Sequence, residues 1–252
     1  MNEAFEILFT ASFWVAAIRI ASPLIFATMG ELICERAGVL NLGVEGMMLV
    51  GAVTGFAVTT MTGATFLGIV SAGLAGAAAS MIFGFLTLTL AANQVATGLA
   101  LTIFGVGLSS LIGAGFVGQT VTMLGPVFPA ALAEHEHLRV LFGYDPVVYF
   151  SFAMTLVVAW FLRRTRAGLI LRAVGENDAS MAGIGGCYYS LFLTPMWAER
   201  LTAGRGWIAL ALVVFAAWRP MRLLAGAYLF GVVMTLELHA KAAGFEYIPP
   251  EF

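Results

Sequence analysis

An uncharged apolar run from Phe66 to Leu90 limits the possible folds of this chain more than any other feature of its sequence. The run is long enough to cross a lipid bilayer as an α-helix, which needs about 20 apolar residues. Five further apolar runs approach or reach that length, at about 8–29, 46–61, 95–114, 146–162 and 223–237. Because 61% of the residues are hydrophobic, the chain also has too little polar surface to cover a soluble globule. The sequence therefore predicts an all-α, polytopic integral membrane protein with about six full transmembrane helices, in one transmembrane domain over residues 1–252.

A cluster of basic residues after Leu162 sets the predicted orientation of the spans. Four arginines follow this apolar run closely: Arg163, Arg164, Arg166 and Arg172. Basic residues at the end of a span favour the cytoplasmic side of the membrane. We therefore predict that residues 163–186 form a cytoplasmic loop. Counting spans back from it, we predict that residues 115–145 form an extracytoplasmic loop.

The cytoplasmic loop also carries signals for local order. Gly175 suits the left-handed residue that ends a helix, and Asn177 or Asp178 can cap the next helix. This pattern of helix, break and helix favours a docking element on the inner face. An ordinary positive-inside loop is the alternative that the charges alone leave open.

Charged residues and glycines interrupt the apolar pattern over residues 30–46. The polar members of this stretch are Glu31, Glu35, Arg36, Asn41 and Glu45. We predict that the first span ends near Met29 and that the stretch is a broken helix. It should line a protein interior or a water-filled path, because irregular backbone at membrane depth is tolerated only there. A short cytoplasmic loop over residues 31–38 is the alternative.

Two further features concern helix packing and polar lining. Small residues recur every four positions in the third run, at Gly68, Ala72, Gly76, Ser80 and Gly84. Such a ridge lets a neighbouring helix approach closely, so it predicts a packing face.

Asn93 and Gln94 form an uncharged polar break after this run, which predicts either a cytoplasmic turn or a polar lining element.

The region after the cytoplasmic loop is too short for two ordinary spans. Residues 183–197 would extend about 22 Å as a helix, against a hydrocarbon core of about 30 Å. The apolar segment from Trp207 to Trp218 is shorter still. We predict half-membrane re-entrant segments that form a hairpin near residues 199–206, with Arg205 packed against polar groups of residues 31–45. A full span missing between Gly186 and Cys187 is the alternative.

No catalytic, metal or nucleotide motif is visible in the sequence. His135 and His137 alternate with glutamates in the loop 115–145, but a solvated loop face is favoured over a metal site. No phosphate-binding loop is present, so ATP hydrolysis by this chain is not expected. A formal net charge of −2 gives no basic field for nucleic acid. The sequence thus indicates neither an enzyme nor a nucleic-acid-binding protein.

Four segments of the chain resemble the permease subunits of bacterial ABC importers for nucleosides and simple sugars. The segments are residues 30–48, 93–101, 171–177 and 202–211, in this order along the chain. The resemblance implies a multi-pass protein of the bacterial cell (inner) membrane, surrounded by membrane lipid. It also implies three kinds of partner: an ABC ATPase subunit, a second permease subunit in a homodimer or heterodimer, and an extracytoplasmic substrate-binding lipoprotein. No cofactor is expected, because ATP is bound by the separate ATPase.

The resemblance also assigns roles to particular residues. It places the ATPase-coupling residues in the cytoplasmic loop, at Arg172, Gly175, Glu176 and Asn177. Together with the charge argument, it predicts a translocation path lined by Glu35, Asn41, Glu45, Asn93, Gln94 and Arg205.

The chain departs from the family pattern in two places. Such permeases usually carry another apolar helix between the coupling loop and the segment 188–197, and another span beyond Phe252. An internally shortened and C-terminally truncated permease is therefore expected. A transport-incompetent relative and a branched-chain amino acid permease are the alternatives.

Overall fold

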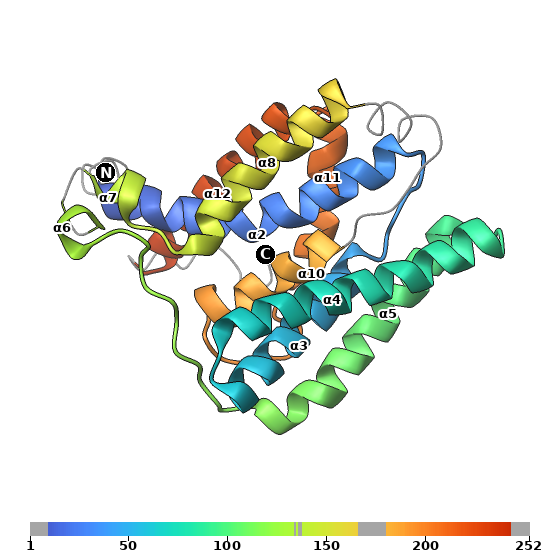
Figure 1. The fold of residues 1–252 in the computed structure, drawn as a ribbon, viewed down its shortest axis with the longest axis horizontal. Helices are drawn as coiled ribbons and strands as arrows, with labels where there is room; N and C mark the ends of the chain where they lie inside the picture. The colour runs from blue at the N-terminus through green and yellow to red at the C-terminus, as the bar shows by residue number, and fades with distance from the viewer. Residues whose placement is uncertain (1–9, 134, 136–137, 166–179, 243–252) are drawn as a thin grey trace.

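The computed structural model describes residues 10–133, 135, 138–165 and 180–242, and most of these residues are helical (Figure 1). The six long apolar helices are α2 (Ala11–Arg36), α3 (Val44–Thr62), α4 (Thr65–Gly84) with its π-helical extension η1 (Phe85–Thr89), α5 (Gln94–Gly113), α8 (Pro146–Arg164) and α12 (Pro220–Ala242). Each is long and apolar enough to cross a membrane. The predicted all-α polytopic fold with six spans is confirmed.

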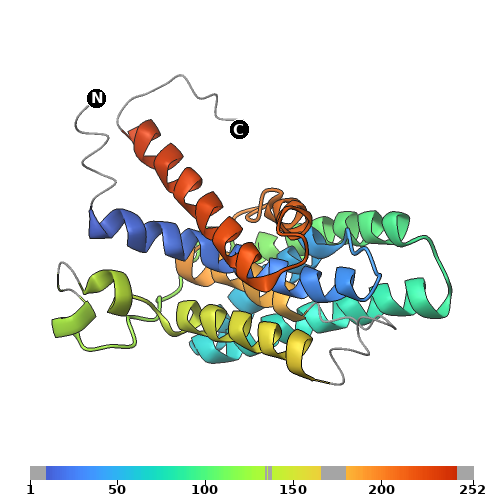
Figure 2. The same ribbon diagram turned by 90° about the horizontal axis from the view of Figure 1, so that it is seen from above.

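Helix α2 is the central element of the fold. It packs against α8, α12, α10 (Ser180–Tyr188) and α11 (Arg205–Phe215). Figure 1 shows α8 and α12 on one side of α2 and α10, α3 and α4 on the other. Leu24, Ile25 and Phe26 in the middle of α2 are fully buried. Figure 2 shows α12 leaning away from the other helices toward its C-terminal end, so α2 and not α12 organises the core.

The first helix is longer than the sequence indicated, because it does not end near Met29. It continues through Pro23 and Glu31 to Arg36, and only residues 37–43 are irregular. The charge of Glu31 does not end the helix because its carboxylate is buried against the backbone of the irregular segment, from which it accepts a hydrogen bond. The predicted break is therefore present, but it is confined to seven residues.

Glycines allow α3 to pack closely between α4 and α10. A Cβ atom on Gly55 would lie 2.6 Å from Cys187 Sγ and 3.1 Å from the carbonyl oxygen of Gly68. Gly186 likewise lies directly against the backbone of Met48. Gly68, Ala72, Gly76 and Ser80 are buried on α4, so the predicted small-residue face does pack against neighbouring helices. Both cysteines, Cys34 and Cys187, are free and buried.

Helices α4 and α5 form one edge of the molecule. Figure 1 shows them meeting at the link 90–93 and spreading apart toward their other ends. Large apolar side chains such as Met81, Ile103 and Leu111 are exposed on them. These faces are suited to contact with lipid or another membrane protein rather than with water.

The two short apolar helices are Met181–Leu193, which comprises α10 and the π-helical η3 (Tyr189–Leu193), and α11. At 11 residues, α11 is about 16 Å long, roughly half of a hydrocarbon core. The link between them turns over residues 199–204, within the range predicted for the hairpin. The first part of the link reaches the segment after α5, where Val121 N–H donates to the Pro195 carbonyl at 3.1 Å.

Backbone strain is concentrated at the two ends of α11. Arg200 and Ala203 precede the helix with φ values of +55° and +44°, and Gly204 caps it at +82°. Ala217 and Trp218 follow the helix with φ values of +50° and +53°. Non-glycine residues seldom adopt this left-handed conformation, so α11 is joined to its neighbours by two strained links.

Candidate functional site

A buried carboxylate organises the polar centre of the molecule. Glu45, in the first turn of α3, is only 6% exposed. It accepts hydrogen bonds from the backbone N–H groups of Gly204 at 2.9 Å and Gly206 at 2.6 Å, and from the Thr202 hydroxyl. These donors are at the N-terminus of α11, where unpaired N–H groups and the helix dipole favour a negative charge. Glu45 therefore caps a helix more than 150 residues further along the chain.

The glycines of this contact are required by space and backbone conformation. A Cβ atom on Gly206 would lie 2.6 Å from the Cα atom of Glu45, so a larger residue would push α3 and α11 apart. Gly204 adopts a left-handed conformation that glycine reaches without a steric penalty. The segment 202–206 contains the predicted path residue Arg205. This segment contacts Glu45 mainly through its backbone.

Arg205 lies beside this contact but its guanidinium group does not take part in it. Its Nη1 atom donates to the Leu201 carbonyl at 3.0 Å, and its guanidinium carbon lies 4.5 Å from the ring centroid of Tyr189. This is a cation–π contact. The prediction that residue 205 packs near the polar groups of residues 31–45 is correct for its backbone segment, and wrong for its side chain. Tyr189, which sequence reasoning missed, is the aromatic partner.

A second buried polar contact lies in the irregular segment that precedes α3. The Asn41 N–H donates to Glu31 Oε1 at 3.2 Å, and Asn41 Oδ1 accepts from the Gly43 N–H at 3.0 Å. Both side chains are almost completely buried. Asn41 thus shapes the break before α3. Glu31 was not among the predicted site residues, although its position one turn before Glu35 was a signal that could have identified it.

Glu35 lies at the opposite end of α11 from Glu45. Its carboxylate accepts a hydrogen bond from Trp218 Nε1, and the neighbouring Arg36 donates to the Trp218 carbonyl from Nη2 at 2.7 Å and from Nε at 3.2 Å. The structure therefore does not bring Glu35 and Glu45 together. Instead, α2 and α3 hold the two ends of α11 through two carboxylates.

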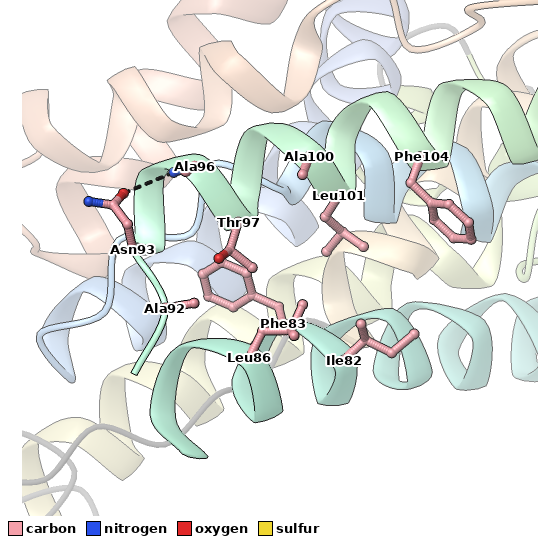
Figure 3. Close-up of a pocket in the computed structure, with 10 residues that line it drawn as sticks. All are labelled: Ile82, Phe83, Leu86, Ala92, Asn93, Ala96, Thr97, Ala100, Leu101 and Phe104. Carbon is pink, nitrogen blue, oxygen red and sulfur yellow. Dashed lines mark hydrogen bonds between the residues drawn. The ribbon is translucent and has the colours of Figure 1, made fainter. Parts of the chain in front are cut away.

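Asn93 and Gln94 have different positions. Gln94 Oε1 accepts from the Leu40 N–H at 2.9 Å and so ties α5 to the irregular segment. Asn93 caps α5 and lines a hollow of about 450 Å³ between α4 and α5. Figure 3 shows apolar side chains of the α4–η1 helix facing Thr97, Leu101 and Phe104 of α5 across this space. The hollow is mostly apolar, with Asn93 and Thr97 as its polar members.

Some predicted residues cannot be placed. The coupling residues Arg172, Gly175, Glu176 and Asn177 lie outside the described residues, as does His137. Within the described part of the chain, no group of three or more His, Cys, Asp or Glu side chains could hold a metal ion. The described polar centre combines a carboxylate, a guanidinium group and a tyrosine ring.

A multi-pass helical protein with a broken helix and a buried polar centre has the architecture expected of a membrane permease. Residues 13–181 match the family described as branched-chain amino acid transport system / permease component. This match covers more than half of the chain, and the chain belongs to this family of ABC transporter permeases in the cell membrane.

Curated relatives agree with this family. The chain is 39% identical to the putative glucose ABC transporter permease protein TsgC13 of Haloferax volcanii, over 96% of this chain and 81% of the relative. It is 28% identical to the guanosine ABC transporter permease protein NupQ of Bacillus subtilis, over 88% and 81% of the two chains. It is 26% identical to the nucleoside ABC transporter permease protein NupC of Lactococcus lactis, over 92% and 84%. No solved structure matches the chain.

The alignments also bear on the length of this chain. They extend over 267, 259 and 266 positions, each more than the 252 residues of this chain. The three relatives therefore contain residues, within the aligned region, that this chain lacks. The shortening expected between Gly186 and Cys187 stays a prediction.

Proposed function

We propose that this chain is the membrane-spanning permease subunit of an ABC importer for nucleosides or simple sugars. The observation that carries the proposal is its similarity to permeases named for glucose, guanosine and nucleosides. All three names refer to hydroxyl-rich solutes that contain a sugar. Such a solute needs hydrogen-bonding groups along its path but no fixed counter-charge.

The polar centre suits a solute of this kind. Glu45 and Arg205 bring one negative and one positive group to the start of α11, and Tyr189 adds an aromatic ring. Their formal charges cancel, so the centre favours a neutral, hydroxyl-rich molecule over an ion. Tyr189 is only 3% exposed, so the centre is closed in this structure. Transport would require the start of α11 to separate from α3.

We assign the six predicted path residues to two places. Asn41, Glu45 and Arg205 belong to the closed polar centre, whereas Asn93 faces the hollow beside α5. Gln94 accepts a hydrogen bond from the irregular segment 37–43, and Glu35 accepts one from Trp218, just after the C-terminal end of α11. In this proposal Glu35 and Gln94 position the path and do not touch the solute.

The ATPase subunit would dock on residues 163–186. This proposal rests on the arginines at the end of α8 and on the family resemblance of Arg172, Gly175, Glu176 and Asn177. A second permease subunit would contact the exposed apolar faces, and a binding lipoprotein would deliver the solute from the opposite side.

The test is uptake by liposomes that contain the permease with its ATPase and binding protein. Radiolabelled guanosine, glucose and leucine are supplied separately, and ATP hydrolysis is measured in the same preparation. Uptake of guanosine or glucose, competed by related solutes, is the expected result. Uptake of leucine alone would favour a branched-chain amino acid permease, which the family description suggests. A complete assembly without uptake of any solute would identify a transport-incompetent relative. Lys241→Gln, at an exposed residue, is the control for a nonspecific loss of uptake.

A further inference from the structure

A small basic pocket lies at the end of α11 opposite the polar centre. Its volume is about 180 Å³. It is lined by Arg36, Leu162, Arg163, Trp218, Arg219 and Pro220. These residues come from the ends of α2 and α8, the start of α12 and the link that joins α11 to α12. We call this site the arginine pocket. Three segments that are distant in sequence, at residue 36, residues 162–163 and residues 218–220, thus bring three guanidinium groups together.

Two of the three arginines in the arginine pocket, Arg163 and Arg219, are not neutralised by the described lining. No carboxylate is among the described residues that line it. Arg163 and Arg219 are exposed and have no ion-pair partner in the described part of the chain. The nearby carboxylate of Glu35 accepts its hydrogen bond from the indole of Trp218. The like charges of Arg163 and Arg219 repel each other at this site, and an anion bound between them would relieve that repulsion.

The position and the walls of the pocket indicate what kind of anion it binds. It lies where α2 and α8 end and α12 begins, and all three helices have the length of membrane spans. This places it at the level of the lipid headgroups. Leu162 and Pro220 are buried and give it an apolar side, whereas the ring of Trp218 is partly exposed, as is common for tryptophan at a membrane interface. A ligand with a phosphate group next to hydrocarbon matches these walls.

We propose that the arginine pocket binds the phosphate of an anionic phospholipid. Arginine pairs well with phosphate because its planar group donates two parallel hydrogen bonds. Basic pockets between spanning helices are suited to anionic headgroups. Arg36 already donates to the Trp218 carbonyl, so the bound lipid would touch the link that holds the end of α11. The proposal does not depend on which solute the permease carries, and of the pocket residues only Arg163 belongs to the segment 163–186 proposed for ATPase docking.

The test is lipid retention by the purified full-length chain in detergent with equal amounts of phosphatidylglycerol and phosphatidylcholine. Native mass spectrometry measures the ratio of the two lipids that remain bound. Each arginine that pairs with the lipid phosphate in the pocket should contribute about a fivefold preference for the anionic lipid. The double variant Arg163→Gln/Arg219→Gln should therefore lose most of the preference, by roughly 25-fold if both contribute fully.

Matched controls separate a pocket from diffuse charge. Arg164→Gln/Arg222→Gln removes the same charge from exposed residues that do not line the pocket, and should keep the preference. Arg163→Lys/Arg219→Lys should keep part of the lipid preference. Partial retention would show that changing these two positions does not by itself unfold the protein. Equal losses in both glutamine variants would overturn the proposal, as would equal retention of both lipids by the parent chain. Displacement of phosphatidylglycerol by millimolar inorganic phosphate would assign the site to free phosphate.

Discussion

The carboxylate of Glu45 accepts a hydrogen bond of 2.6 Å from the backbone N–H of Gly206, although the two residues are 161 positions apart. This bond joins the first turn of α3 to the first turn of α11. A charged acceptor at a helix N-terminus forms a stronger hydrogen bond than a neutral one. The contact therefore fixes where the short helix begins.

The first prediction concerns the charge of Glu45. Glu45→Gln keeps the shape of the side chain but weakens its bonds to Thr202, Gly204 and Gly206. We expect a loss of about 1–3 kcal/mol in the free energy of unfolding, and reduced uptake. Thermal unfolding in detergent measures the first effect. Glu237→Gln, which breaks an exposed ion pair on α12, should change stability by about 0.5 kcal/mol or less. If Glu45→Leu is as stable and as active as the parent, the capping role is wrong.

The second prediction concerns the close contact between α3 and α10. Gly186→Ala places a methyl group against the backbone of Met48, which cannot move aside as a flexible side chain could. Overpacking of this kind costs about 1–3 kcal/mol. Gly107→Ala on α5 is the matched control, because nothing lies within 4 Å of the added carbon. The control should be neutral or slightly stabilising, since alanine favours a helix. Equal melting temperatures for both variants would contradict the packing shown here.

The third prediction concerns alkaline pH. Tyr144 lies before α8, and burial followed by repulsion from Tyr149 raises the pKa of its hydroxyl. A raised pKa in the folded state means that stability is complete below the unfolded pKa of about 10 and falls as the pH rises above it. The hydroxyl has no hydrogen-bond partner in the described structure. Tyr144→Phe should therefore cost little stability at neutral pH and lessen its loss in alkali. A large loss at neutral pH would indicate a hydrogen bond that this structure lacks.

The fourth prediction concerns the orientation of the chain and rests on the proposed function. A cysteine at Ser180 should react only with reagent that reaches the cytoplasmic side. The background is low because both natural cysteines are buried. Replacing Glu176 should uncouple ATP hydrolysis from uptake while membrane insertion stays normal. Labelling of Ser180→Cys in intact cells by an impermeant reagent would reverse the predicted orientation.

Sequence reasoning identified the spans because the ability of an apolar run to cross a membrane depends only on its own length and composition. It also brought the segment of Arg205 near residues 31–45, since charges at membrane depth must find polar partners. It could not predict which atoms meet, because the donors to Glu45 include backbone N–H groups that no side-chain pattern reveals. The extension of α2 past Met29 was missed for a similar reason. The backbone N–H of Asn41, across the break, donates a hydrogen bond to the Glu31 carboxylate, so the charge of Glu31 does not end the helix.

The left-handed residues on either side of α11 determine where the molecule can bend. Each non-glycine residue of this kind costs about 1–2 kcal/mol, and four of them lie in the two links, at Arg200, Ala203, Ala217 and Trp218. The hydrogen bonds inside α11 are regular, so a change in these links can turn the helix without breaking it. In mechanical terms, α11 is a rigid helix with a hinge at each end, and one glutamate holds each hinge through hydrogen bonds. Loss of the hydrogen bonds of either glutamate would free one end of the helix while the other end stays in place.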